Sequence, residues 1–307
     1  MAFKLNKNDL RLLAAIAEHR ILSAGQVAAL FMKSKQVVRR RMRNLEKATF
    51  VQAHEPVLGH GPGRPERLFS LSGDGIDLLR EHEILNPDVA NDKVGAERLR
   101  CIDHELLCTW FRIHLEHIQH VFPRLSVQFL SPNSPFLQRD QDDRPFVFEQ
   151  VPIGSDRERQ IGFTPDGVFS ITDREQQKAL LFFLEVDMGT ESVASPKRAP
   201  RDVRQKIINY QAYFRSSLHK RYEKTWDCKF SGFRLLFVTN SNARMTLLCR
   251  LALKMPPSDF VWVTEQGRMF AHGLSAEIWA RGGRYQSPLE SILGRQMARP
   301  SPLSVKP

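Results

Sequence analysis

Several features are scarce or missing in this chain of 307 residues, and each shortage excludes a class of protein. The four cysteines show no CxxC spacing, which argues against a disulfide framework and against a zinc ribbon. No stretch approaches the roughly 18 apolar residues of a membrane helix, and the first residues lack the apolar core of a secretory signal, so we expect a cytoplasmic protein that does not engage a membrane. P-loop, GxGxxG and GxSxG motifs are also missing, which argues against helicases, nucleotide-dependent dehydrogenases and serine hydrolases.

Acidic residues are the minority charge, with 34 Asp and Glu against 45 Lys and Arg and a formal net charge of +11. This balance makes a polyanion the first partner to consider. The length predicts about two domains. We predict an α+β chain with a DNA-binding domain over residues 1–85, a linker and helix start over 86–100, an α/β domain with a mixed central sheet over 101–281, and a loosely ordered basic tail over 282–307.

Three short helices are predicted near the amino terminus. The first begins at Asn8, and the second follows Ser23, which together with Gln26 has the spacing of a capping box. Ser34 is the predicted N-cap of the third helix, which extends to Ala48. The segment 33–47 carries seven basic residues against one acid. Three short helices of which the last is strongly basic are typical of a helix-turn-helix domain.

The segment after the third helix predicts a wing. A short strand over 50–53, a loop over 54–66 rich in Gly and Pro, and a return strand over 67–71 form a hairpin, and a closing helix is expected over 73–83. Arginine can bond a guanine edge or a phosphate, so we expect duplex DNA contacts from Lys35, Arg39, Arg40, Arg41, Arg43, Arg64 and Arg67. A solvated basic face and a winged helix that contacts only proteins are the alternatives, and a homodimer on a palindromic site is left open.

The most informative segment of the second half is a predicted antiparallel hairpin with strands over 167–171 and 179–187. Its register places Ile171 near Ala179 or Leu180, and Asp166 opposite Leu184 or Glu185. Side chains alternate along a strand, so Glu185 and Asp187 share a face. Three carboxylates, Asp166, Glu185 and Asp187, are therefore expected to converge at one end of a sheet.

Converging carboxylates are what a hard divalent cation requires. Mg²⁺ or Mn²⁺ held by Asp166, Glu185 and Asp187 is the expected cofactor, and it can activate water beside a phosphate. Lys206, on the basic amphipathic helix downstream, is expected to orient a water or a phosphate. We therefore predict Asp166, Glu185, Asp187 and Lys206 as catalytic residues. The alternative is a structural network in which the acids pair with basic residues of that helix.

Four motifs together resemble the replication-relaxation family of bacterial mobile elements: PDGVF at 165–169, FFLEVDMGTES at 182–192, QKIINYQAYF at 205–214 and FRLLFVT at 233–239. The resemblance implies an amino-terminal winged helix joined to an α/β unit. It also implies a role in plasmid replication and DNA relaxation, or in transcriptional control, with replication or mobilisation proteins as further partners. The family's acidic stretch is matched by residues 185–191, and its Lys–Tyr helix by Lys206 and Tyr210.

The same motifs are similar to the PD-(D/E)xK nuclease superfamily. Asp166 matches the first acid and Glu185 the second, whereas Asp187 stands where the lysine is expected, and Lys206 lies on the next helix, where some members carry it. The resemblance implies a nuclease-like fold. Three functions stay open: a DNA-binding protein with a nuclease-like domain, an active Mg²⁺-dependent endonuclease targeted by the winged helix, and an interaction module with a degenerate nuclease fold.

Overall fold

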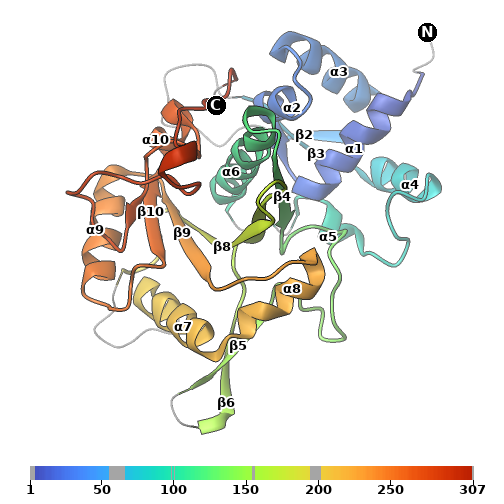
Figure 1. Cartoon of the computed structure of the whole chain (residues 1–307). Coiled ribbons are helices and arrows are strands. Elements are labelled where there is room, and N and C mark those ends of the chain that lie inside the picture. Colours follow the sequence, from blue (N-terminus) through green and yellow to red (C-terminus); the bar gives the residue numbers. More distant parts are fainter. Residues whose placement is uncertain are drawn as a thin grey trace. The chain divides into compact units, whose positions relative to one another are not determined.

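The computed structural model describes residues 4–54, 66–97, 99, 101–153, 156–193 and 202–305. Helices and strands occur in both halves, and the largest sheet mixes parallel and antiparallel strands, so the predicted α+β class is confirmed. Contacts divide the chain into two compact units (Figure 1). The first comprises Met1–Ile113, Asn133–Asp140 and Ser304–Pro307, and the second comprises His114–Pro132 and Gln141–Leu303. The four predicted segments and their boundaries stay predictions. No helix in the described part of the chain is long and apolar enough to cross a membrane.

The first unit begins with short helices followed by a small sheet. Its elements are α1 (Lys7–His19), β1 (Leu22–Ser23), α2 (Ala24–Leu30), α3 (Lys35–Lys47), β2 (Val51–His54), β3 (Leu68–Leu71), α4 (Gly73–Glu81) and α5 (Asn91–Val94). The sheet has the order β1-β3-β2 and is antiparallel throughout. Ser23 and Gln26 form the predicted capping box, and the Ser34 hydroxyl accepts a hydrogen bond from the Val37 N–H. The predicted loop of the wing, with Arg64, falls largely outside the described residues.

A single apolar core fixes the rotation of α3 in the first unit. Val38, Met42 and Leu45 are buried in it, together with residues of α1, α2, β3 and α4. These three positions follow the helical repeat, so they lie on one face of α3. The opposite face of the helix is therefore left to solvent, and it carries most of the helix's charge.

The second unit is built on a six-stranded sheet. Its strands are β4 (Leu125–Leu130), β7 (Gly167–Asp173), β8 (Lys178–Asp187), β9 (Phe233–Thr239), β10 (Val261–Glu265) and β11 (Ala280–Arg281), in the order β11-β10-β9-β8-β7-β4. Strands β8, β9 and β10 are parallel to one another, and the other pairs are antiparallel. Ile171 pairs with Leu180, and the Asp166 N–H bonds the Leu184 carbonyl at 3.0 Å, so the predicted hairpin register is confirmed.

Helices pack against both faces of this sheet. They are the second half of α6 (Ile102–Val121), α7 (Val203–Ser216), α8 (Arg221–Trp226), α9 (Asn242–Leu253) and α10 (Gln266–His272). Because α7 and α9 each connect neighbouring parallel strands in the same direction, right-handed crossovers place both on one face (Figure 1). Phe183 packs there against Tyr210 and Tyr213, whereas Phe182 stacks on Phe169 on the other face.

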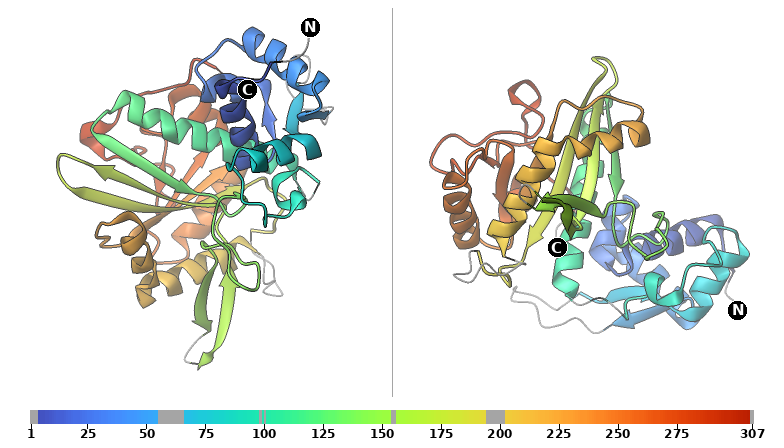
Figure 2. Two further views of the ribbon diagram at one scale, coloured as in Figure 1. Left: turned by 90° about the vertical axis from the view of Figure 1, so that its right-hand side faces the viewer. Right: turned by 90° about the horizontal axis from the view of Figure 1, so that it is seen from below.

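Two parts of the second unit differ from expectation. A separate hairpin of β5 (Glu149–Ile153) and β6 (Asp156–Phe163) projects from the six-stranded sheet (Figure 2), and the second of these strands was not predicted. The predicted loose tail has little regular structure, as expected, but it is packed: Ile292 and Leu293 are buried, and the Ser291 hydroxyl donates to the Ser275 carbonyl at 2.8 Å. Apolar side chains between the Gly and Pro residues explain the packing.

Two glycines of α4 test how this helix docks in the first unit. A Cβ added at Gly75 would lie 2.1 Å from the Phe50 carbonyl oxygen, whereas one added at Gly73 would meet no atom within 4 Å. Because the backbone at Phe50 would have to move to make room, we expect Gly75→Ala to lower the free energy of unfolding by about 3 kcal/mol. Gly73→Ala is the matched control and should change it by less than about 1 kcal/mol. Urea titrations of both variants decide, and equal effects would refute the docking of α4 on Phe50.

Candidate functional site

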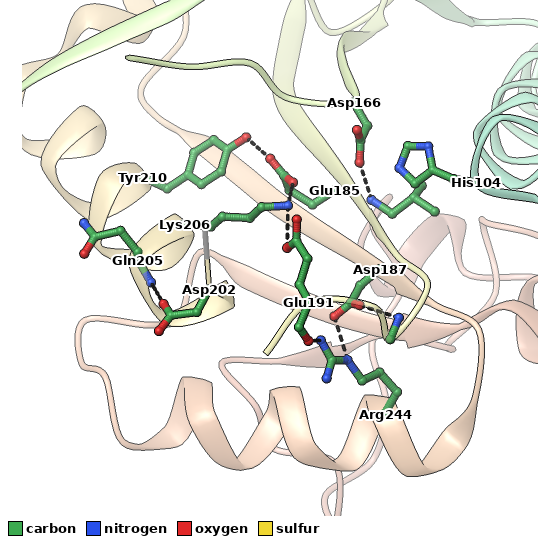
Figure 3. A network of polar contacts seen from close by, with 12 residues as sticks. His104, Asp166, Glu185, Asp187, Glu191, Asp202, Gln205, Lys206, Tyr210 and Arg244 are labelled. Carbon is green, nitrogen blue, oxygen red and sulfur yellow. Dashed lines mark hydrogen bonds and ion pairs between the residues drawn. The ribbon is translucent and has the colours of Figure 1, made fainter. Parts of the chain in front are cut away.

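A buried carboxylate at the end of β8 is the centre of the candidate site. Glu185 is 3% exposed. The Asp202 side chain caps α7 by accepting from the Gln205 N–H, and the Val203 N–H bonds the Ser192 carbonyl, which ties the start of the helix to the chain just after β8. Lys206 and Tyr210 are four residues apart and therefore lie on one face of α7. Lys206 Nζ lies 3.0 Å from Glu185 Oε2, and the Tyr210 hydroxyl donates to Glu185 Oε1 at 2.7 Å (Figure 3).

The second acid of this cluster is Asp166, in the turn before β7. Its Oδ2 accepts a hydrogen bond of 2.7 Å from the Val186 N–H, which anchors the carboxylate beside the end of β8. The charge of Asp166 is one of the influences that raise the pKa of Glu185. The structure thus brings together three of the four predicted catalytic residues, Asp166, Glu185 and Lys206.

The protonation states follow from burial and neighbouring charge. Burial raises the pKa of Glu185, and the ammonium of Lys206 opposes this rise. Burial would lower the pKa of Lys206, but the charges of Glu185, Asp166 and Glu191 outweigh it and raise that pKa. Lys206 is therefore a permanent cation, suited to hold an anion and unsuited to accept a proton. Burial, followed by the charge of Glu185, raises the pKa of Tyr210, which keeps its hydroxyl a hydrogen-bond donor.

Asp187, the fourth predicted catalytic residue and third predicted metal ligand, has different partners. Its Oδ2 accepts from Arg244 Nε at 2.9 Å, and its Oδ1 accepts from the Gly189 N–H at 2.8 Å (Figure 3). Gly189 has a φ of +77°, which a glycine adopts without strain. Glu191 joins the two groups, since its carboxylate lies 3.0 Å from Lys206 Nζ and its carbonyl accepts from Arg244 Nη2 at 2.6 Å.

Arg244 was not predicted from the sequence. It belongs to the first turn of α9, 57 residues after Asp187, and no motif marks it. It comes near because β9 runs parallel to β8 with Thr239 opposite Asp187, so the helix after β9 starts beside that carboxylate. Arg244 could have been found only if the pairing of β9 with β8 had been known.

The second candidate site is the solvent face of α3 in the first unit. Arg39, Arg40 and Arg43 are exposed. Arg39 and the half-buried Lys35 share Glu66 as an ion-pair partner, at 3.4 and 3.9 Å, and Arg67 lies 3.4 Å from Glu46. Among the described residues, Arg40 has no ion-pair partner. Five of the seven predicted DNA-contacting residues, Lys35, Arg39, Arg40, Arg43 and Arg67, thus lie on or beside one surface.

Arg41 faces the other way. Its Nε donates to Asp9 Oδ1 at 2.5 Å, its Nη2 contacts Asp9 Oδ2, and the Asp9 side chain is only 3% exposed. A bidentate pair with a buried carboxylate ties α3 to α1. The structure therefore gives Arg41 a partner inside the first unit, whereas Arg39, Arg40 and Arg43 are exposed.

The comparison with protein families extends over most of the elements described above. The family model for replication-relaxation matches residues 13–227, which is more than half of the chain. The chain belongs to the replication-relaxation family. In this replication-relaxation protein the match spans α3 and the cluster of Asp166, Glu185 and Lys206, whereas Arg244 lies beyond it. Neither the curated proteins nor the solved structures contain a match to the chain.

Removing the ammonium of Lys206 should make stability depend on pH. Lys206→Met leaves Glu185 buried beside Asp166, so its pKa rises further above the ordinary value of 4.5. Below that value Glu185 is protonated in both folded and unfolded states, and the loss is small. As the pH rises from the pKa of Glu185 in the parent toward the higher pKa in the variant, of the two folded proteins only the parent releases this proton, so the loss relative to the parent grows to about 3 kcal/mol at pH 7.

Urea titrations of this variant across pH, with EDTA present, measure the effect. The control is Lys206→Met combined with Glu185→Gln, which removes the unpaired charge and should recover most of the stability at pH 7. A loss of the same size at every pH would assign the effect to packing of the lysine stem instead of to its charge.

Proposed function

We propose that this replication-relaxation protein binds duplex DNA through α3. The observation that supports the proposal most directly is the division of the helix into two faces: Val38, Met42 and Leu45 are buried, and Arg39, Arg40 and Arg43 are exposed. The order of helices and strands from α1 to β3 supports the winged-helix interpretation. An α-helix fits the major groove, where arginine bonds base edges and phosphates.

Charge reversal on α3 tests DNA binding. Arg40→Glu with Arg43→Glu replaces two cations by two anions, so we expect affinity for duplex DNA to fall about 100-fold and the salt slope to shrink by about 2. Fluorescence anisotropy with a labelled duplex over a series of salt concentrations measures both quantities. The DNA sequence that the protein prefers is first identified by selection from a random duplex library and then used as the labelled probe.

The matched control changes the charge by the same amount elsewhere. Lys224→Glu with Arg250→Glu reverses two exposed cations of the second unit that have no ion-pair partner in the described part of the chain. DNA binding that is unchanged by the α3 variant, or reduced equally by both variants, would refute the assignment to α3.

A second candidate function is metal-dependent cleavage of DNA by the second unit. The antiparallel strands β4, β7 and β8 are followed by α7 and the parallel strand β9, and this order supports the nuclease-like interpretation. Asp166 and Glu185 supply hard carboxylate oxygens, the donor type that Mg²⁺ and Mn²⁺ prefer. When bound, such an ion would activate water and stabilise a leaving oxygen.

The chain's own residues prepare this chemistry. Tyr210 and Lys206 each hold one oxygen of Glu185, which fixes the direction of the carboxylate. The Val186 N–H does the same for Asp166. Because Lys206 stays protonated, its role would be to attract and orient a phosphate. Asp187 bonds Arg244 and the Gly189 N–H instead of the groups that surround Glu185, so we leave it out of the proposed metal ligands.

Incubation with supercoiled plasmid, with and without Mg²⁺ or Mn²⁺, tests cleavage. We expect metal-dependent nicked or linear product, reduced at least about 100-fold in Asp166→Asn and in Glu185→Gln. The control is the Lys224→Glu and Arg250→Glu variant, which should cleave normally. Cleavage that survives both acid variants would assign it to another site. Retained DNA binding without any cleavage would favour a DNA-binding protein, or an interaction module, with a degenerate nuclease fold.

A further inference from the structure

A groove of about 450 Å³ opens at the end of the sheet opposite the acidic cluster. It is lined by the first residues of β8 and β9, by residues at the start of β10, and by the carboxyl end of α7. Glu185 lies near the other end of β8, five residues beyond Leu180, which corresponds to roughly 17 Å along an extended strand. The groove is therefore separate from the candidate site described above, and its volume is in the range of small-molecule pockets.

Aromatic rings form much of this groove. Phe214, Phe233, Phe260 and Trp262 line it, and Phe214 is 39% exposed. The ring of Phe214 lies 5.3 Å from that of Phe233 and 5.7 Å from that of Phe260. One side of the Phe214 ring stacks on His219, with ring centroids 5.9 Å apart, and the exposed part of the ring is the surface on which a planar base can stack.

Three arginines also line the groove, and their donors are incompletely used. Arg215 is exposed and has no hydrogen-bond or ion-pair partner among the described residues. Arg281 lies 3.6 Å from Asp259 and 3.7 Å from Glu290, too far for hydrogen bonds, and its buried Nε has no partner there either. Arg234 contacts the Ile292 carbonyl and lies 4.7 Å from the centre of the Trp262 ring.

Arg234 and Arg281 place two positive charges beside the same indole ring. Arg281 lies 5.9 Å from the centre of Trp262, on the same ring as Arg234. Burial, followed by the repulsion of Arg281, lowers the pKa of Arg234. Asp259 is the one acid that lines the groove, and it also pairs with Arg284 at 2.8 Å. The groove thus has an excess of positive charge that an anion would relieve.

We propose that this groove binds a nucleoside monophosphate unit, as a free nucleotide or as the terminal nucleotide of a single strand. The base would stack on Phe214, and the phosphate would accept hydrogen bonds from Arg215 and Arg281. Flat aromatic faces favour a planar base over a flexible acidic peptide, and guanidinium groups match the geometry of phosphate oxygens. This proposal does not depend on DNA binding by α3 or on cleavage at Glu185.

Isothermal titration calorimetry with the full chain tests the proposal. The probes are dTMP, a short 5′-phosphorylated oligothymidylate, thymidine and inorganic phosphate. We expect dTMP to bind with a Kd on the order of 100 μM, and thymidine and phosphate at least about tenfold more weakly. Comparable affinities for dTMP and the oligonucleotide identify the free nucleotide as the ligand, and tighter binding of the oligonucleotide identifies a strand end.

Two groove variants and two controls locate the binding. Arg215→Ala and Arg281→Gln should each lower the affinity for dTMP about tenfold. Arg250→Ala, which removes an exposed arginine of α9, should leave dTMP binding unchanged. The Arg40→Glu and Arg43→Glu variant should also bind dTMP normally, which would show that α3 does not contribute to binding in the groove. Circular dichroism confirms that each variant is folded. The proposal is overturned if dTMP does not bind at about 5 mM, if phosphate competes as well as dTMP, or if the groove variants bind normally.

Discussion

The interaction on which the second unit depends is the burial of the Glu185 carboxylate between Lys206 and Tyr210. An ionised carboxylate in an apolar sheet is costly unless it is paired and hydrogen-bonded. Here both conditions are met by one helix, since an ammonium and a phenol four residues apart on α7 each take one oxygen. The pair therefore determines where α7 lies against β8. Asp166 lies beside this pair, and its carboxylate is anchored by the Val186 N–H.

The same rule governs the arginines of α3. Asp9 is almost fully buried, and Arg41 is the cation that compensates it. Arg40 has no ion-pair partner in the described part of the chain, and it lies on the solvent face of α3. Adjacent arginines in one helix thus have different surroundings: Arg41 holds α1 against α3, whereas Arg40 is exposed and is the one on which the DNA-binding proposal rests. The dense basic segment is therefore less uniform than its composition indicates.

Much of this could be predicted from the sequence because the controlling interactions are local. The hairpin of β7 and β8 follows from a short polar turn and strand alternation, so the register of Ile171 and the approach of Asp166 to β8 were predictable. The orientation of Arg41 could also have been found, since it lies three residues after Val38 and four before Leu45, at the edge of the buried stripe. Its partner Asp9 could not, because that contact depends on how α1 crosses α3. Arg244 was beyond reach for the same kind of reason, since it depends on the pairing of β9 with β8.

Helix α7 connects the two ends of the sheet. Its 14 residues span roughly 21 Å, so its first turns lie beside the acidic cluster and its last turn lines the groove. Its buried middle, with Tyr210 and Tyr213 against Phe183, keeps it rigid against the sheet. Lys206 and Arg215 are therefore held on one rigid helix. Lys206 lies beside the carboxylates at one end of the sheet, and Arg215 lies among the aromatic rings and arginines of the groove at the other end. One helix therefore carries a cation for each of the two sites proposed in this unit, so a change in its position against the sheet would alter both.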